Sequence, residues 1–240
     1  MTTAMSIYGE GTAELALTDE ISSELALCDG LVGGGGDFLP YIKLMQSTSP
    51  EVEADLAKRG DYFIKLGNEG VNLSKEFDCA VISMRPKAVE WRDGKPIICY
   101  DSAIENGKPT GEYARIEQAA ADWDGPKSKN PFKTGPEFLL ALRDVYNGEM
   151  PVKFATLHLN TPSLKYQYRK VASFLGKHAT IIGEKVEMPD YTFAGLDIRP
   201  NSAGFPIDIA EMNEVRTKFK EEKSTPVSTV SEEDASNDRD

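Results

Sequence analysis

The sequence predicts a mainly β protein of the α+β class, built as a small barrel with an inserted irregular lobe and one substantial helix. Short apolar segments recur along residues 38–220 and are separated by turn-forming residues, a pattern typical of small barrels. Two of these turns, Asp93-Gly94 and Asn147-Gly148, carry strong hairpin signals. Within the body of the chain, the segment after Thr161-Pro162 has the clearest helical pattern.

In the first half of the body we expect strands that alternate with tight turns. Ser49 and Pro50 should start a short helix, because Ser is a favoured helix cap and Pro is favoured at the first helical position. The expected strands cover residues 41–45, 61–65, 79–84, 88–91 and 97–100, and the last two are joined through the Asp93-Gly94 turn.

The second half is less regular. Residues 101–136 are rich in Gly, Pro, Asn and Lys, and we expect a long loop or an inserted lobe there. Residues 137–160 fit two strands around Asn147-Gly148, and a helix over residues 137–147 fits equally well. The remaining expected elements are a helix over residues 161–176, strands over residues 191–198 and 205–209, and a polar helix over residues 211–222.

Acidic residues are concentrated at both ends of the chain. Residues 1–37 hold seven acidic side chains and no Lys or Arg, and residues 221–240 hold seven acidic side chains against two basic ones. The residues between these ends carry equal numbers of acidic and basic side chains, so the net charge of −12 comes from the ends. The acidic total therefore does not exclude a polyanionic partner for the body.

This composition divides the chain into three parts. Residues 1–36 should be a flexible acidic arm that closes in the glycine linker 33–36, because such a segment buries too little apolar surface to fold. Residues 37–222 should form the β-rich binding domain, and residues 223–240 a disordered acidic tail.

Several function classes are not expected. Three cysteines without a Cys-x-x-Cys pair favour reduced thiols in the cytoplasm over a disulfide framework. Two histidines without a close cysteine pair disfavour a structural zinc site. We expect no membrane segment and no secretion signal. The motifs of serine hydrolases, zinc proteases and P-loop enzymes are absent, so we expect a non-enzymatic protein without a cofactor.

The stretch from residue 150 to residue 183 contains no Asp or Glu over 34 residues. On the helix expected there, Leu164, Tyr168, Val171 and Leu175 are spaced for one buried face. The opposite face combines Tyr166 with Arg169, Lys170 and Lys177. Cations that follow phosphates and a ring that stacks under a base are what single-stranded nucleic acid requires. The alternative is an ordinary solvated helix face.

Two further segments combine cations with an aromatic ring. The first holds Lys127, Lys129 and Lys133 around Phe132, and its alternative interpretation is a solvated loop. The second is the expected hairpin, in which alternation along the strand places Trp91 on one face with Lys87, and Arg92 and Lys95 follow. Here the alternative is that Trp91 belongs to the core, because tryptophan is usually largely buried.

The organisation of the chain resembles bacteriophage single-stranded DNA-binding proteins of the OB-fold type. The likeness lies in the β-rich body, in the tail SEEDASNDRD at residues 231–240, and in the segments LPYIKLMQ at 39–46 and GDYFI at 60–64. It implies an OB-like barrel that binds single strands in phage DNA replication and recombination, within the host cytoplasm. In this class the acidic tail docks replication and recombination proteins and competes with DNA. Many such tails end in an aromatic or apolar tip, whereas this one ends in Asp240.

These observations give a set of expected contacts. A homo-oligomer is compatible with this interpretation. The alternative function is a virion, scaffold or adaptor protein that binds another protein through its acidic arms. The expected DNA contacts are Trp91, Arg92, Lys95, Lys127, Lys129, Lys133, Tyr166, Arg169, Lys170 and Lys177, and the expected partner-docking residues are Glu232, Glu233, Asp234, Asp238 and Asp240.

Overall fold

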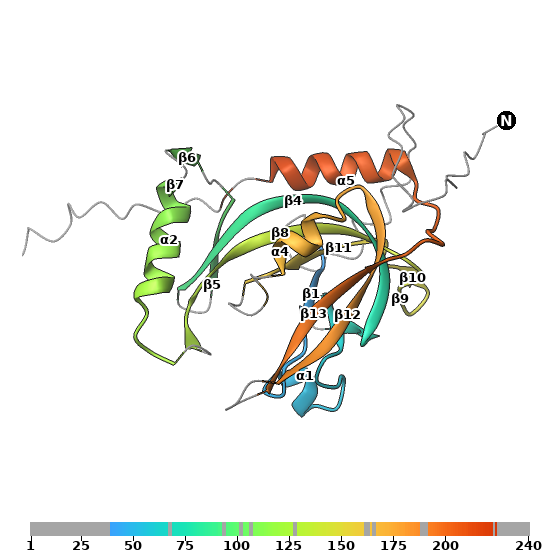
Figure 1. Cartoon of the computed structure of the whole chain (residues 1–240), viewed down its shortest axis with the longest axis horizontal. Coiled ribbons are helices and arrows are strands. Elements are labelled where there is room, and N and C mark those ends of the chain that lie inside the picture. The colour runs from blue at the N-terminus through green and yellow to red at the C-terminus, as the bar shows by residue number, and fades with distance from the viewer. Residues whose placement is uncertain are drawn as a thin grey trace, which may run out of the picture. The chain divides into compact units, whose positions relative to one another are not determined.

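The computed structural model is mainly β and divides into two compact units (Figure 1). The first unit contains the described residues up to Lys87 and those from Thr134 to Glu222. The second contains Ala88–Lys133 and Ser224, so in sequence it is largely an insertion in the first. The structure describes residues 39–66, 69–92, 95–100, 103–105, 108–126, 129–160, 164, 167–187, 192–222 and 224.

The first unit is built on one mixed sheet. The spatial order of its strands is β13 (Thr192–Pro200), β12 (Lys177–Glu187), β4 (Glu76–Arg92), β8 (Phe132–Leu142), β11 (Phe154–His158), β1 (Tyr41–Leu44), β2 (Tyr62–Leu66) and β3 (Glu69–Ser74). Strands β1 and β11 are parallel, whereas the pairs β1–β2, β2–β3, β8–β11, β4–β12 and β12–β13 are antiparallel. Strands β4 and β8 continue beyond this unit into residues of the second.

This sheet curls around its own apolar core without closing into a barrel by strand pairing. The side-chain amide of Gln46, just after β1, donates to the carbonyl of Ala194 at 3.0 Å and accepts from its amide at 2.9 Å, as a neighbouring strand would. Gly183 on β12 packs closely against the backbone of Gly60, which precedes β2. A Cβ at position 183 would lie 1.9 Å from the carbonyl oxygen of Gly60. Side-chain contacts and close backbone packing therefore bring the β12–β13 hairpin onto the segment around β1 and β2.

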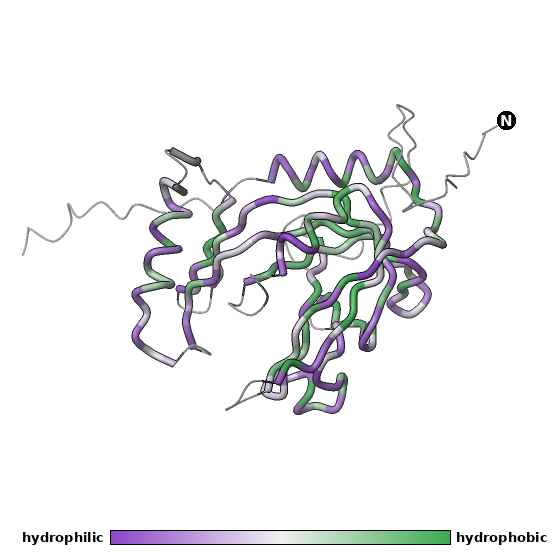
Figure 2. The backbone as a smooth tube through the Cα atoms, in the orientation of Figure 1, coloured by the Kyte–Doolittle hydropathy of each residue, from purple (hydrophilic) through white to green (hydrophobic). Residues whose placement is uncertain are grey.

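Helices cover this sheet on both faces. Helix α5 (Ile209–Glu221) buries Met212, Val215 and Phe219 on the outer face, at a spacing that places all three on one side of a helix. Figure 2 shows hydrophilic and hydrophobic residues alternating along α5, as this packing requires. Asp208 caps the helix by accepting hydrogen bonds from the amides of the first turn. On the inner face, the short helix α4 (Tyr168–Ala172) buries Val171 in the core.

The second unit packs a helix on a hairpin. The end of β4 pairs with β5 (Lys95–Cys99), and α2 (Gly111–Asp122) follows the small hairpin of β6 (Ala103–Glu105) and β7 (Lys108–Thr110). Tyr113 and Ile116 of α2 form a separate core with Ala88, Cys99 and Phe132. No helix in the described part of the chain is long and apolar enough to cross a membrane.

Local signals in the sequence predicted much of this fold correctly. The first two expected strands are β1 and β2, and Ser49-Pro50 begins the short helix α1 (Pro50–Glu53). The Asp93-Gly94 segment joins β4 to β5 with Arg92 opposite Lys95. Around Asn147-Gly148 the two-strand interpretation is confirmed, because β8 pairs with β11 and the small strands β9 (Tyr146–Asn147) and β10 (Met150–Pro151) lie between them.

Three expectations about the fold are wrong. Residues 101–136 belong largely to an inserted unit, as one of the two expected alternatives had it, but they are not irregular, because α2, the β6–β7 hairpin and the start of β8 lie there. Residues 205–209 are not a strand, since they have no strand partner and lead directly into α5. In the described part of 161–176 the helix α4 has only five residues, and Tyr168 and Leu175 are 38% and 39% exposed rather than buried. The chain turns after α4, which leaves Leu164 and Val171 as the buried pair.

Candidate nucleic-acid interface

The structure separates the expected contacts into one group in each unit. The second unit holds Trp91, Arg92, Lys95, Lys129 and Lys133, and the first unit holds Arg169, Lys170 and Lys177. Outside the described residues lie Lys127, Tyr166, the acidic arm at 1–36 and the tail positions Glu232, Glu233, Asp234, Asp238 and Asp240.

Trp91 is not a core residue. It lies near the end of β4, opposite Pro96 of β5, and its amide donates to the carbonyl of Pro131 at 3.1 Å. Ala88 and Glu90 face α2, so alternation along the strand directs Trp91 to the opposite face. Its side chain is 49% exposed. The backbone of Trp91 is therefore fixed on both sides while its ring remains available to a ligand.

The side chain of Arg92 points to the opposite face of the hairpin from Trp91, and a carboxylate compensates its charge. Its guanidinium binds the carboxylate of Glu90 at 2.6 Å and lies on the α2 side of the hairpin. Glu90 also binds Arg115 of α2, which in turn contacts Glu112 at 2.7 Å. The hydrogen bond from Arg92 lowers the pKa of Glu90 against the opposing effect of burial. Arg92 is therefore a charge-compensated residue, and it does not share a face with the indole.

Three lysines of the second unit are not compensated by any acidic side chain that the structure describes. Lys95, Lys129 and Lys133 form no ion pair with any described residue. Lys95 and Lys129 are exposed, whereas Lys133 is half-buried and its burial lowers its pKa. The ring of Phe132 packs on the core of the second unit, so it does not serve as a stacking surface. In the segment around Phe132, the lysines rather than the ring are therefore available to a ligand.

The first unit presents a second patch around α4 and β13. The phenol oxygen of Tyr168 accepts a hydrogen bond from Arg169 at 3.0 Å, and the guanidinium carbon lies 5.8 Å from the ring centroid. Lys170 pairs with Asp197 of β13, and Arg199 contacts the same carboxylate at 3.4 Å. Lys177 starts β12 and is not on the helix, contrary to expectation. The exposed ring of this patch is that of Tyr168, which the sequence pattern assigned to the core.

A recurring arrangement was missed by the sequence analysis. Four buried carboxylates each hold two cations: Glu51 binds Lys43 and Lys65, Glu90 binds Arg92 and Arg115, Glu137 binds Arg85 and Lys87, and Asp197 binds Lys170 and Arg199. Arg92 and Arg199 each lie two positions after the carboxylate that they bind, Glu90 and Asp197. All the other cations come from a different strand or helix than the carboxylate that they bind. Alternation along a strand predicts those two contacts, and nothing local predicts the others.

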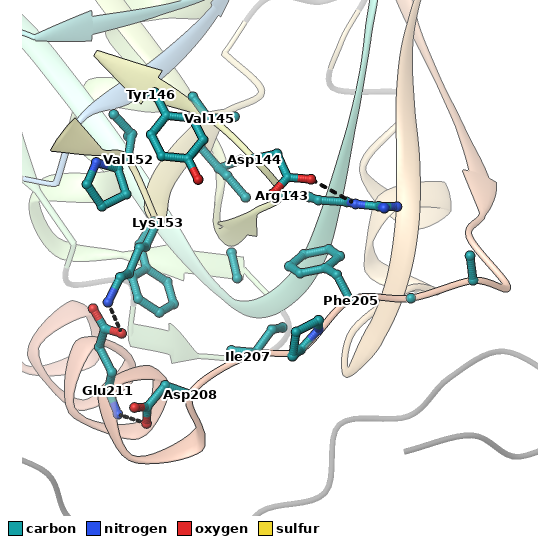
Figure 3. Close-up of a pocket in the computed structure, with 17 residues that line it drawn as sticks. Arg143, Asp144, Val145, Tyr146, Val152, Lys153, Phe205, Ile207, Asp208 and Glu211 are labelled. Atoms are coloured by element: carbon teal, nitrogen blue, oxygen red, sulfur yellow. Dashed lines mark hydrogen bonds and ion pairs between the residues drawn. The ribbon is translucent and has the colours of Figure 1, made fainter. Parts of the chain in front are cut away.

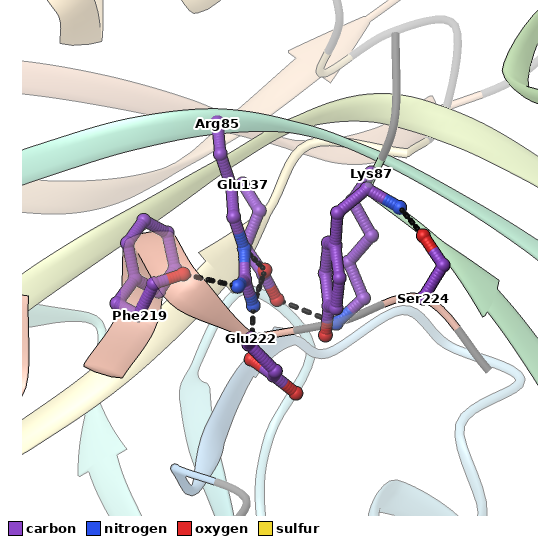
Figure 4. Close-up of polar contacts among 7 residues, drawn as sticks. Arg85, Lys87, Glu137, Phe219, Glu222 and Ser224 are labelled. Carbon is purple, nitrogen blue, oxygen red and sulfur yellow. Dashed lines mark hydrogen bonds and ion pairs between the residues drawn. The ribbon is translucent and has the colours of Figure 1, made fainter. Parts of the chain in front are cut away.

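The cluster around Glu137 is structural (Figure 4). Arg85 contacts Glu137 at 2.7 Å, Glu222 at 2.6 Å and the carbonyl of Phe219, and its guanidinium lies 4.0 Å from the Phe219 ring centroid. Lys87 binds the other carboxylate oxygen of Glu137 at 2.5 Å. This buried network ties the end of α5 to β4 and β8. By contrast, the cation pairs held by the other three carboxylates remain partly exposed.

The first unit also contains a groove of about 620 Å³ between the β9–β10 hairpin and the segment that precedes α5 (Figure 3). Val145 and Val152 lie on one side of it, and Phe205 and Ile207 lie on the other. Its basic groups are compensated, since Lys153 pairs with Glu211 at 2.9 Å and Arg143 with Asp144 at 3.3 Å. Among the described residues, no three His, Cys, Asp or Glu side chains are placed to hold a metal ion.

No family model matches the sequence, and no curated protein or solved structure is significantly similar to the chain.

Proposed function

We propose that this protein binds single-stranded DNA without strong sequence preference and acts in bacteriophage DNA replication or recombination, without enzymatic activity or a cofactor. The observation that carries the proposal is the 49% exposed indole of Trp91, fixed on a hairpin in the same unit as Lys95, Lys129 and Lys133, which have no acidic partner among the described residues. Stacking of a base on such a ring is worth about 1–3 kcal/mol, and it tolerates any base because each has a π-face.

The patch in the first unit supports the same function. Tyr168 and Arg169 combine an exposed ring with a guanidinium, and Lys170 and Arg199 add two cations against the single charge of Asp197. Such a surface attracts a polyanion despite the acidic total of the chain. We further propose that the curled sheet of this unit is an elaborated OB-like barrel, since OB-folds are small, partly open barrels that bind oligonucleotides.

The start of the acidic tail supports its proposed role as a competitor of DNA. The hydroxyl of Ser224 accepts a hydrogen bond from the amide of Tyr100 at 3.0 Å, directly after β5. Pro96, the partner of Trp91, is four residues earlier, a distance of about 13 Å along a strand. Residues 225–240 add five acidic side chains. A tethered polyanion of this kind has a local concentration on the order of millimolar. The same acidic residues would recruit replication and recombination proteins when DNA displaces them.

One observation favours the second candidate function, a virion, scaffold or adaptor protein. Tyr146 and Met150 are exposed apolar residues on the two small strands beside the groove, and Tyr146 is 54% exposed. Exposed apolar side chains next to a groove that is lined in part by apolar residues are typical of protein-binding surfaces. On this alternative the groove, rather than Trp91, is the functional surface.

A fluorescence titration distinguishes the two functions. The chain has two tryptophans, so a Trp123→Phe variant leaves Trp91 as the only indole. Addition of a mixed-sequence single-stranded oligonucleotide should quench this indole. Trp91→Ala should weaken binding about 5- to 150-fold, which corresponds to about 1–3 kcal/mol, while Tyr146→Ala serves as a matched control with unchanged affinity. Absence of quenching, together with equal affinity of wild type and Trp91→Ala, would favour the adaptor function.

A further inference from the structure

The outer face of the β1–β2 pair carries a third combination of ring and cations. In the antiparallel register Tyr41 lies opposite Lys65, and Lys43 lies opposite Phe63. The intervening residues Ile42, Leu44 and Ile64 are in the core of the first unit. Alternation along both strands therefore directs Tyr41, Lys43 and Lys65 away from that core. None of these three residues belongs to the set of contacts expected from the sequence.

The ring of Tyr41 is available to a ligand. Its side chain is 49% exposed, the same fraction as that of Trp91. Burial of the other half raises the pKa of its hydroxyl against the opposing effect of Lys65, so the phenol is neutral at physiological pH. A neutral, half-exposed ring on a paired strand is a suitable surface for a base to stack on.

Lys43 and Lys65 are both held in place by one buried carboxylate. Glu51, which is only 4% exposed, binds Lys43 at 3.0 Å through one carboxylate oxygen and Lys65 at 2.6 Å through the other. The two lysine side chains remain 36% and 30% exposed. Lys65 also lies 5.9 Å from the centroid of the Phe63 ring. One carboxylate against two ammonium groups leaves a net positive charge, and the fixed geometry reduces the entropy lost when an anion binds.

We propose that Tyr41, Lys43 and Lys65 form an additional binding site for the single strand, in which a base stacks on Tyr41 and a phosphate is bound by the two ammonium groups. The inference rests on the proposed DNA-binding function and extends it to a surface of the first unit. Its charge pattern repeats that of the patch at α4, where the carboxylate of Asp197 holds Lys170 and Arg199.

Two substitutions with opposite expected effects test this site in the full-length protein. Lys43→Gln removes one cation but leaves Glu51 paired with Lys65, so the buried carboxylate keeps a partner. It should weaken oligonucleotide binding several-fold at low salt and reduce the slope of log affinity against log salt by about 0.7. Glu51→Gln leaves both cations uncompensated and should strengthen binding instead. A purely structural cluster would lower thermal stability in both variants without changing the salt slope in either.

The ring is tested separately. Tyr41→Ala should weaken binding at least about 5-fold, whereas Tyr146→Ala, which removes a similarly exposed tyrosine of the same unit, should not. Irradiation of a complex with an oligonucleotide that contains 5-iodouracil should give an adduct on the peptide that holds Tyr41. Lys75→Gln is the matched control for the lysines, because Lys75 is exposed and forms no ion pair with the described residues.

The outcomes separate failure of this site from failure of the proposed function. If the wild type binds single strands, but Tyr41→Ala and Lys43→Gln bind with wild-type affinity and salt slope, the additional site is wrong and the proposed function stands. If the wild type binds no oligonucleotide at any salt concentration, both are wrong. If an acidic peptide binds and Lys43→Gln weakens that binding while oligonucleotide binding is unaffected, the surface recognises protein rather than DNA.

Discussion

Exchange of Lys95 for glutamine should make DNA binding both weaker and less sensitive to salt. Five cations of the expected contact set form no ion pair with any described residue, namely Lys95, Lys129, Lys133, Arg169 and Lys177. Each phosphate contact on a single strand contributes about 0.7 to the slope of log affinity against log salt. One phosphate contact by each of these five cations contributes about 3.5 to the magnitude of the slope, and Lys95→Gln should reduce this contribution to about 2.8.

The assay is fluorescence anisotropy of a labelled single-stranded oligonucleotide at salt concentrations between about 50 and 200 mM. Arg92→Gln should change the slope less than Lys95→Gln, because Glu90 already compensates the charge of Arg92. Lys75→Gln should leave the slope unchanged and controls for the general loss of positive charge. Equal reductions for Lys75→Gln and Lys95→Gln would refute the reasoning, since binding would then depend on net charge rather than on this patch.

Three further predictions concern the tail and two buried carboxylates. Removal of residues 225–240 should leave the melting temperature unchanged and strengthen DNA binding at low salt, and the difference from wild type should narrow as salt screens the tail; no gain at any salt would exclude competition. Glu137→Gln should lower the free energy of unfolding in urea by about 3–5 kcal/mol, because it removes the buried carboxylate that Arg85 and Lys87 share and leaves Glu222 as the carboxylate in contact with Arg85; a loss below about 1 kcal/mol would contradict the structural role. Burial alone would raise the pKa of Glu51, but hydrogen bonds from Lys65 and Lys43 lower it from 4.5 to about 2. Because the folded state has the lower pKa, this carboxylate stabilises the fold fully above pH 4.5 and loses that contribution, about 3 kcal/mol, as the pH falls towards 2. Stability measured against pH should therefore fall less steeply in this range for Glu51→Gln than for wild type.

The parts of the fold that follow from local sequence signals were predictable. The Asp93-Gly94 and Asn147-Gly148 dipeptides identify their hairpins because Asp-Gly and Asn-Gly between apolar segments are strong short-range hairpin signals. Helix α2 was missed because glycine- and proline-rich segments surround it and Tyr113 and Ile116 are its only buried residues among those described. Helix α4 ends early because the chain turns to begin β12, a tertiary constraint that helical periodicity does not contain.

The candidate site was predictable in residue type but not in geometry. Composition directed attention to Trp91, but its exposure depends on the packing of α2 against the other face of the hairpin. The compensation of Arg92 by Glu90 follows from their spacing of two residues on a strand. The pairing of Glu51 with Lys65 needs the register of β1 and β2 together with the position of α1, and short-range patterns provide neither.

We propose that the protein recognises DNA as a single strand, with bases stacked on exposed rings. The most direct test is an equilibrium titration at low salt with one labelled oligonucleotide, presented first as a single strand and then as a duplex with its complement. Both forms carry phosphates, but only the single strand offers free base faces to Trp91. We predict tighter binding to the single strand, and a preference that is largely lost in Trp91→Ala. Equal affinity for both forms, or no binding to either, would contradict the claim.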